Sequence, residues 1–420
     1  MTDRTKAPLI HDFVFLPPLN PHRHTLDNGI QCLLLPNAHL AIVQMIVQIK
    51  AGAFYQEKLG VATACLKMLR EGTASLSSAE IAEQLDYIGS YLICNAGKDY
   101  VSLHIYFPPK ATRQVMCLLA DLLKNPTFPQ QQLDIYKQNL KNELAVEFEK
   151  TSYKARCCFM ETIFDQHPYG RILHIDDIDH IHRSDLEAFF QQYYHAKNIK
   201  IFAAGQIDNS FVENVEEYFG DIVGKTNAEP TLITHIPQAE KKYFEKQDAV
   251  QSSIFIGQRS ITKQDPDWPV FSLASLVLGG YFGSRLMKNI REDKGLAYHI
   301  YANLHTFVHA GMFYVAADVN KSQVQESVGQ IYHEMEVLQT ALMSKEELTL
   351  VKNYLYGSLM KCFDGVFAQL DLLLETEKHN LPLAFWANYV ECIKTMTADD
   401  LLAGAARMLD MDNMTEIIVG

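Results

Sequence analysis

Residues 184–205 read SDLEAFFQQYYHAKNIKIFAAG, and residues 397–420 read TADDLLAGAARMLDMDNMTEIIVG. Each begins with a hydroxyl side chain, Ser184 or Thr397, followed by acidic residues, as helix N-termini prefer. Each continues as an amphipathic helix, an asparagine and a short apolar strand that ends in glycine seven residues after the asparagine. The two segments therefore predict the same helix–strand unit at two places in the chain.

The elements that precede each unit also repeat. A strand, a loop and an apolar helix are predicted from IVQMIVQIKAG (42–52) and again from VQSSIFIGQRS (250–260). A strand, a turn and a helix are predicted over 99–123 and again over 311–338. Repetition at about half the chain length indicates a duplicated domain. The alternative is that the echoes arise by chance, because strand–helix order is common.

Strands and helices mix in each half without strict alternation. We therefore predict an α+β fold of two tandem homologous domains, each an antiparallel-rich sheet with helices packed on one face. The polar segment GKTNAEPTLITHIPQAEK, which carries two prolines, predicts a linker at 224–241. The N-terminal domain would span 1–223 and the C-terminal domain 242–420.

Composition narrows the function. The chain has 420 residues, of which 48% are hydrophobic and 21% charged, as in soluble globular proteins. A net charge of −13 without a Lys/Arg cluster argues against nucleic acid as a partner. No apolar run approaches the ~18 residues of a membrane span, and no signal peptide is visible. Eight cysteines without a C-x-x-C pair are typical of a reduced compartment, so we predict a cytoplasmic protein without membrane contact.

The stretch GVATACLKMLREGT (60–73) predicts a helix with one apolar face. With LDNGIQCLLLP (26–36) before it, a strand that ends in Ala-Gly and a loop, this stretch resembles the pitrilysin/insulinase family of zinc metallopeptidases. That family carries His-x-x-Glu-His on this helix, where two histidines one turn apart bind zinc and the glutamate activates water.

Here the three motif positions hold Thr63, Leu66 and Lys67, none of which supplies the chemistry of the residue it replaces. Glu143 stands where the resemblance places the family's third zinc ligand. The resemblance thus implies a degenerate zinc site and no cofactor bound by this chain. One hypothesis is that Lys67 takes the place of the metal and pairs with Glu143. The alternative is that both are solvated surface charges.

Two further segments extend the resemblance. The segment IGSYLICNAGKDYVSLHIYF (88–107) is similar to the edge strand on which active members hold a peptide by main-chain hydrogen bonds, with Ile93, Cys94, Asn95 and Ala96 at the matching positions. The alternative is an ordinary strand. In FGSRLMKNIREDKGLAYHIYA (282–302), the resemblance assigns Arg291 and Tyr298 to substrate binding and oxyanion stabilisation. The alternative is that Arg291 pairs with Glu292 or Asp293 and that Tyr298 belongs to the core.

Some family members of this length work as pairs, in which one subunit carries zinc and the other supplies the Arg and the Tyr. The resemblance therefore implies the zinc-free subunit of a heteromeric metalloendopeptidase, with a peptide substrate and zinc on a homologous partner. The alternative is a catalytically inactive homodimer that binds peptides or serves a structural role. A third possibility is an independent hydrolase with a displaced metal at Glu143 and the histidines of HIDDIDHIH (174–182).

Overall fold

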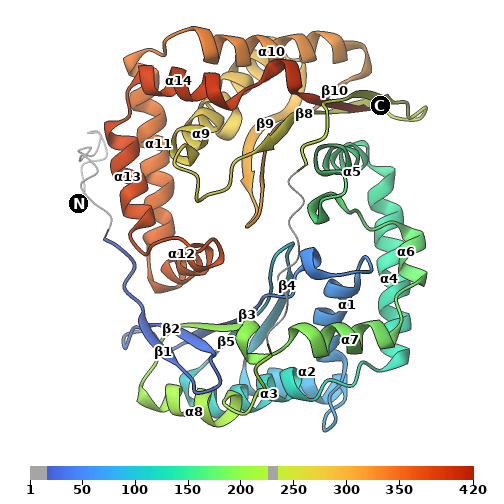
Figure 1. Cartoon of the computed structure of the whole chain (residues 1–420), viewed down its shortest axis with the longest axis vertical. Coiled ribbons are helices and arrows are strands. Elements are labelled where there is room, and N and C mark those ends of the chain that lie inside the picture. Colours follow the sequence, from blue (N-terminus) through green and yellow to red (C-terminus); the bar gives the residue numbers. More distant parts are fainter. Residues whose placement is uncertain (1–16, 226–234) are drawn as a thin grey trace, which may run out of the picture.

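The computed structural model describes residues 17–225 and 235–420, which form two α+β halves joined side by side (Figure 1). In the first half, a six-stranded sheet has the order β1-β2-β6-β3-β5-β4. The pair β2–β6 is parallel and the other pairs are antiparallel. The strands are β1 (His22–Thr25), β2 (Gln31–Pro36), β3 (Val43–Ile49), β4 (Tyr91–Ala96), β5 (Val101–Phe107) and β6 (Ile199–Gly205). The helices are α1 (Val61–Met68), α2 (Ser78–Ile88), α3 (Thr112–Lys124), α4 (Gln130–Glu149), α5 (Thr151–Phe164), α6 (Ile175–Asp179), α7 (Arg183–Tyr193) and α8 (Asn209–Phe219).

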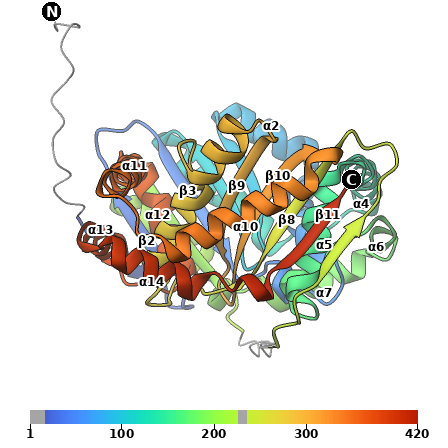
Figure 2. The ribbon, with the colours of Figure 1, turned by 90° about the horizontal axis from the view of Figure 1, so that it is seen from above.

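The second half holds a five-stranded sheet of order β7-β11-β8-β10-β9. Figure 2 shows α10 crossing this sheet on its outer face. The strands are β7 (Lys241–Phe244), β8 (Gln251–Ser260), β9 (Ala297–Thr306), β10 (Gly311–Asn320) and β11 (Thr415–Val419). The helices are α9 (Trp268–Ser275), which continues as a π-helix (Leu276–Gly280), a second π-helix (Met287–Asp293), α10 (Val324–Thr340), α11 (Lys345–Phe363), α12 (Val366–Lys378), α13 (Phe385–Thr395) and α14 (Ala398–Met408).

The two sheets share one topology, which confirms the predicted two-domain α+β fold. The order β2-β6-β3-β5-β4 matches β7-β11-β8-β10-β9, and in both the first pair is parallel and the rest antiparallel. The repeated strands lie where the sequence places them. The domain limits themselves stay a prediction, and residues 226–234 of the expected linker lie outside the described residues.

The expected caps differ between the two repeats. Thr397 is the N-cap of α14, where its hydroxyl accepts the N–H of Asp400 at 3.1 Å. The expectation for Ser184 is wrong, because α7 begins at Arg183 and its N-cap is His182. The backbone N–H of His182 donates to the Asp185 carboxylate at 2.9 Å, so the carboxylate three residues on closes the helix start in both repeats.

One helix of each half packs on the sheet of the other half. Helix α5 packs on β8 and β11, where Phe159 lies 5.7 Å from Phe255, ring to ring. Helix α12 packs on β6 and β2, and its Glu377 accepts from Lys200 at 2.7 Å. In Figure 1, α5 and α12 both lie between the two sheets. Each sheet is therefore covered on its second face by a helix from the other half, a feature that the one-faced prediction did not include.

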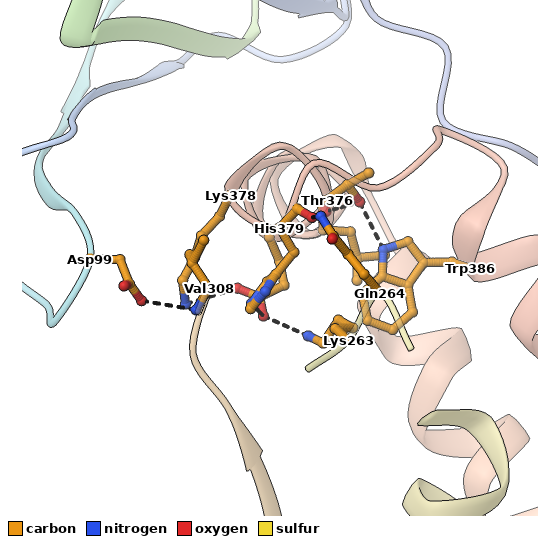
Figure 3. Close-up of polar contacts among 10 residues, drawn as sticks. Asp99, Lys263, Gln264, Val308, Thr376, Lys378, His379 and Trp386 are labelled. Carbon is orange, nitrogen blue, oxygen red and sulfur yellow. Dashed lines mark hydrogen bonds and ion pairs between the residues drawn. The ribbon is translucent and has the colours of Figure 1, made fainter. Parts of the chain in front are cut away.

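The turn between β9 and β10 docks into the first half. The N–H of Val308 donates to the Asp99 carboxylate at 3.2 Å, a contact drawn in Figure 3. The N–H of His309 donates to the hydroxyl of Tyr169 at 3.2 Å, and that hydroxyl itself donates to Asp99. Phe307 packs against Tyr169, with ring centroids 4.3 Å apart. Because Asp99 and Tyr169 are both fully buried, these bonds form in a site that excludes water. We call this contact between the β9–β10 turn and the first half the hairpin clasp.

His167 contacts Tyr169 of the hairpin clasp and makes the stability of this contact depend on pH. The side chain is buried, its Nδ1 accepts the N–H of Tyr169 at 3.2 Å, and its ring lies 4.6 Å from that of Tyr169. Burial, with the nearby charges of Arg259 and His309, lowers the pKa of His167 to about 4. The neutral imidazole is thus the form that fits the folded protein.

The stability of the protein should fall as pH drops from about 6.5 to about 4. In this range His167 is protonated in the unfolded chain but stays neutral in the folded protein, so protons favour unfolding. The His167 contribution to this loss is expected to reach about 3 kcal/mol at most. In His167→Asn, the amide oxygen can replace Nδ1 as acceptor without titrating. Urea unfolding at pH 7 and pH 4.5 should show a smaller pH-dependent loss for His167→Asn than for the wild type. Equal losses would contradict the assignment.

Candidate functional site

The three degenerate motif positions lie on α1, which begins after Gly60 in a left-handed conformation (φ 84°). The side chain of Leu66 is fully buried in the core, Thr63 is half-buried, and Lys67 is exposed. The Lys67 ammonium donates to the backbone carbonyl of Cys94 at 2.9 Å. The polar face of the helix therefore contacts the strand that was predicted to bind peptide.

These residues do not fit zinc. Leu66 offers no ligand atom, and a lysine ammonium held by a carbonyl would repel a dication. The hypothesis of a Lys67–Glu143 pair is wrong, because the structure describes both residues and forms no ion pair between them. Glu143 is exposed on α4, which packs beside α1. That the chain binds no zinc in solution stays a prediction.

The acidic and histidine-rich segment 174–182 forms helix termini. His174 and His182 are the N-caps of α6 and α7. Within residues 17–225 and 235–420, no three His, Cys, Asp or Glu side chains are placed to hold a metal ion. The geometry thus gives no support to a displaced metal at Glu143 and these histidines.

The predicted peptide-binding residues, Ile93, Cys94, Asn95 and Ala96, lie on β4, the edge strand of the first sheet. The side chain of Cys94 is buried, whereas those of Asn95 and Ala96 are exposed. An edge strand presents unpaired backbone groups that another strand can join. The Lys67 contact already uses the carbonyl of Cys94, so a peptide added along β4 must share or displace that bond.

Arg291 and Tyr298 lie together on the second half. Arg291 is near the end of the second π-helix, and Tyr298 is the second residue of β9, after a turn at Gly295 (φ 62°). The guanidinium carbon of Arg291 lies 5.4 Å from the ring centres of both Tyr298 and Phe282. The guanidinium is therefore held by cation–π contacts with two aromatic rings.

The surroundings of these residues exclude the alternative in which Tyr298 belongs to the core and Arg291 pairs with Glu292 or Asp293. Tyr298 is 79% exposed and Phe282 is 66% exposed, so neither belongs to the core. Arg291 forms no ion pair with Glu292 or Asp293, all three of which the structure describes. The role of Phe282 was not predicted, although this residue begins the segment 282–302. A single aromatic residue does not by itself indicate a contact with an arginine nine positions later.

A partly buried ion cluster beside the clasp is structural. Figure 3 shows Lys263 and His379 converging on α12, where Glu375 Oε1 lies 2.6 Å from Lys263 and 3.1 Å from His379. Although burial opposes it, these two partners hold the pKa of Glu375 well below its usual range. The Lys263 ammonium also lies 5.5 Å and 5.4 Å from the rings of Trp268 and Trp386. Through these contacts the cluster ties α12 and α13 to the segment after β8.

Comparisons with known proteins agree with this geometry. The family described as "Insulinase (Peptidase family M16)" matches residues 33–176, and the one described as "Peptidase M16 inactive domain" matches residues 180–355. The uncharacterized zinc protease YmxG of Bacillus subtilis is 25% identical over 92% of this chain and 95% of its own length. An uncharacterized zinc protease of Rickettsia bellii is 21% identical over 94% of this chain and 96% of its own.

Solved structures show the same fold. A peptidase M16 inactive domain from Pseudomonas fluorescens superposes with a TM-score of 0.89 at 23% identity, covering 96% of this chain and 98% of that one. A protease from Helicobacter pylori superposes with a TM-score of 0.87 at 18% identity, covering 96% and 100%. In the described residues, no helix is long and apolar enough to cross a membrane. Two adjoining family matches and a shared two-sheet fold place this chain in the insulinase family of peptidases, M16.

Proposed function

We propose that the chain is the zinc-free subunit of a two-subunit metalloendopeptidase and supplies Arg291 and Tyr298 to the active site of a zinc-bearing partner. One observation carries the proposal. The chain presents an exposed Tyr298 beside a half-buried Arg291 whose guanidinium contacts two aromatic rings, while its motif positions, Thr63, Leu66 and Lys67, do not fit zinc. Such a chain has donors for a reaction that it cannot start alone.

The chemistry of the pair suits peptide hydrolysis. When water attacks a peptide carbonyl, negative charge develops on the carbonyl oxygen, and fixed N–H and O–H donors stabilise it. Arg291 offers guanidinium donors and Tyr298 a phenol hydroxyl. Phe282 and Tyr298 both contact the guanidinium and limit the motion of Arg291. On the partner, zinc would supply the activated water.

The surface of the second half supports association. Exposed apolar side chains occur near this pair and on α11, among them Phe282, Leu350, Tyr354 and Met360. Tyr354 packs against Tyr281 with ring centres 4.8 Å apart, which joins α11 to the segment that carries Phe282. Exposed apolar side chains grouped in this way are typical of protein interfaces.

Reconstitution tests the proposal. We expect near-zero zinc by elemental analysis of this chain purified without chelator or His tag, and no peptidase activity. Mixing it with a homologue from the same organism that carries His-x-x-Glu-His should form a complex and produce peptide cleavage that neither chain shows alone. Full activity of the zinc-bearing chain by itself would contradict the proposal, as would one zinc per chain in this protein.

A second candidate is a catalytically inactive peptide-binding homodimer. The edge strand β4 favours it, because strand addition needs no metal. The same experiment separates the two functions. A stable homodimer in sedimentation that binds peptide and ignores every zinc-bearing homologue would support the second candidate.

A further inference from the structure

A cavity of about 270 Å³ opens beside the degenerate motif. Its wall includes Thr63 of α1, Ala96 at the end of β4, and three cationic side chains. The cations come from separate segments, namely Lys98 after β4, Arg156 on α5, and Arg171 before α6. No Asp or Glu is among the residues that line it. We call this cavity the basic pocket.

Among the described residues, Lys98, Arg156 and Arg171 form no ion pair, although the carboxylate of Asp99 lies near enough to Lys98 to favour its charge. Lys98 donates to the carbonyl oxygens of Tyr169 and Arg171, at 3.2 and 3.4 Å. Arg171 donates to the carbonyl oxygens of Gln56 and Glu57. Carbonyl groups satisfy the donors but carry no charge, so they fix these two side chains without balancing them.

Arg156 contacts an aromatic ring and, among the described residues, no carbonyl oxygen. Its guanidinium lies 5.1 Å from the ring of Tyr153, and in the described part of the chain it makes no hydrogen bond or ion pair. Burial, followed by repulsion from Arg156, lowers the pKa of Lys98. Cations crowded in this way stabilise an anion placed among them. A pocket of this kind stands out in a chain whose net charge is −13.

The position of the pocket indicates what the anion belongs to. Ala96 ends the edge strand β4, Gly97 follows it, and both line the pocket, so an extended peptide along β4 would pass directly over it. The guanidinium groups suit a carboxylate, which accepts two parallel N–H donors. Both an acidic side chain and a free peptide C-terminus carry that group.

We propose that the basic pocket binds a carboxylate of the peptide held on β4 and gives this chain a preference for acidic peptides. The inference rests on the peptide-binding role of β4 in the proposed function. It concerns this chain alone, so it can be tested without a zinc-bearing partner or any cleavage.

The test measures binding of fluorescent decapeptides to the full chain by anisotropy at low salt. One peptide contains three Glu residues and a C-terminal amide, a second has Gln in their place, and a third is the Gln peptide with a free C-terminus. The Glu peptide should bind at least tenfold more tightly than the Gln peptide, with an affinity that falls as salt rises. Tighter binding by the third peptide instead would identify the C-terminus as the carboxylate.

Two variants locate the effect. Arg156→Gln should lower the affinity for the preferred carboxylate peptide about tenfold and leave the Gln amide peptide unchanged, because exposed Arg156 loses only its contact with the ring of Tyr153 and no hydrogen bond or ion pair among the described residues. Arg156→Glu should lower that affinity further, because the new carboxylate repels the anion and offsets one of the two remaining cations. The control, Arg183→Gln, removes an exposed arginine of α7 that pairs with Glu187 and should change neither affinity.

Several results would overturn the inference. They are equal binding of all three peptides, no binding of any of them, or an Arg156→Gln variant that binds like the wild type. Failure of the proposed two-subunit function would appear differently, as a mixture without cleavage whatever this binding assay shows.

Discussion

Replacing Arg291 and Tyr298 together with alanine should lower kcat/KM of the reconstituted pair by about two to three orders of magnitude. Tyr298 is exposed and Arg291 is half-buried, and neither belongs to the core of the second half, so their loss should not disturb the fold of the chain. The donors act on charge that develops in the transition state, so the loss should appear mainly in kcat. Steady-state cleavage of a fluorogenic peptide by the pair measures both parameters.

Single and control variants separate chemistry from assembly. Tyr298→Phe keeps the ring that contacts Arg291 but lacks the hydroxyl, so a large loss in this variant would assign the effect to the phenol O–H. The control is Arg183→Ala with Tyr87→Ala, which removes an exposed arginine and an exposed tyrosine from the first half. It should stay within twofold of the wild type. If the Arg291 and Tyr298 double variant also stays there, the pair does not act on the substrate.

The sequence predicts those parts of the molecule whose signal is local. The repeat around Asn198 and Asn413 leads to two sheets of one topology, because each strand and its preceding helix are adjacent in the chain. Arg291 and Tyr298 are seven residues apart and are joined by one tight turn, so their proximity also follows from the sequence. The loss of zinc ligands at Thr63 and Lys67 is read directly from residue types.

Contacts between distant segments could not be predicted in this way. The exchange of α5 and α12 between the halves depends on which apolar faces meet after both sheets have formed. Lys67 bonds to Cys94 rather than Glu143 because a backbone carbonyl of β4 lies within reach of the ammonium, a fact of packing rather than of motif spacing. The basic pocket joins Lys98, Arg156 and Arg171 from three segments, and no pattern in the chain links them.

Tyr169→Phe should destabilise the protein by about 2–3 kcal/mol, although it removes a single oxygen. That oxygen donates to Asp99 and accepts the N–H of His309, and both it and Asp99 are fully buried. Without it, a buried carboxylate and a backbone N–H each lose a partner in a site that excludes water. Urea unfolding measures the loss, and Tyr87→Phe, at a tyrosine that is 86% exposed, should change stability by less than about 0.5 kcal/mol.

Hydrogen exchange decides whether this loss concerns the hairpin clasp in particular. In Tyr169→Phe, the amides of Val308 and His309 should exchange much faster than in the wild type, because their acceptors come from the loosened contact. Ile331→Val, in the core of the second half on α10, should lower stability by about 0.5–1.5 kcal/mol without singling out these two amides. If exchange of these two amides instead rises equally in both variants, the hairpin clasp does not open independently of the rest of the protein. The exchanged helices α5 and α12 would then be what holds the two halves together.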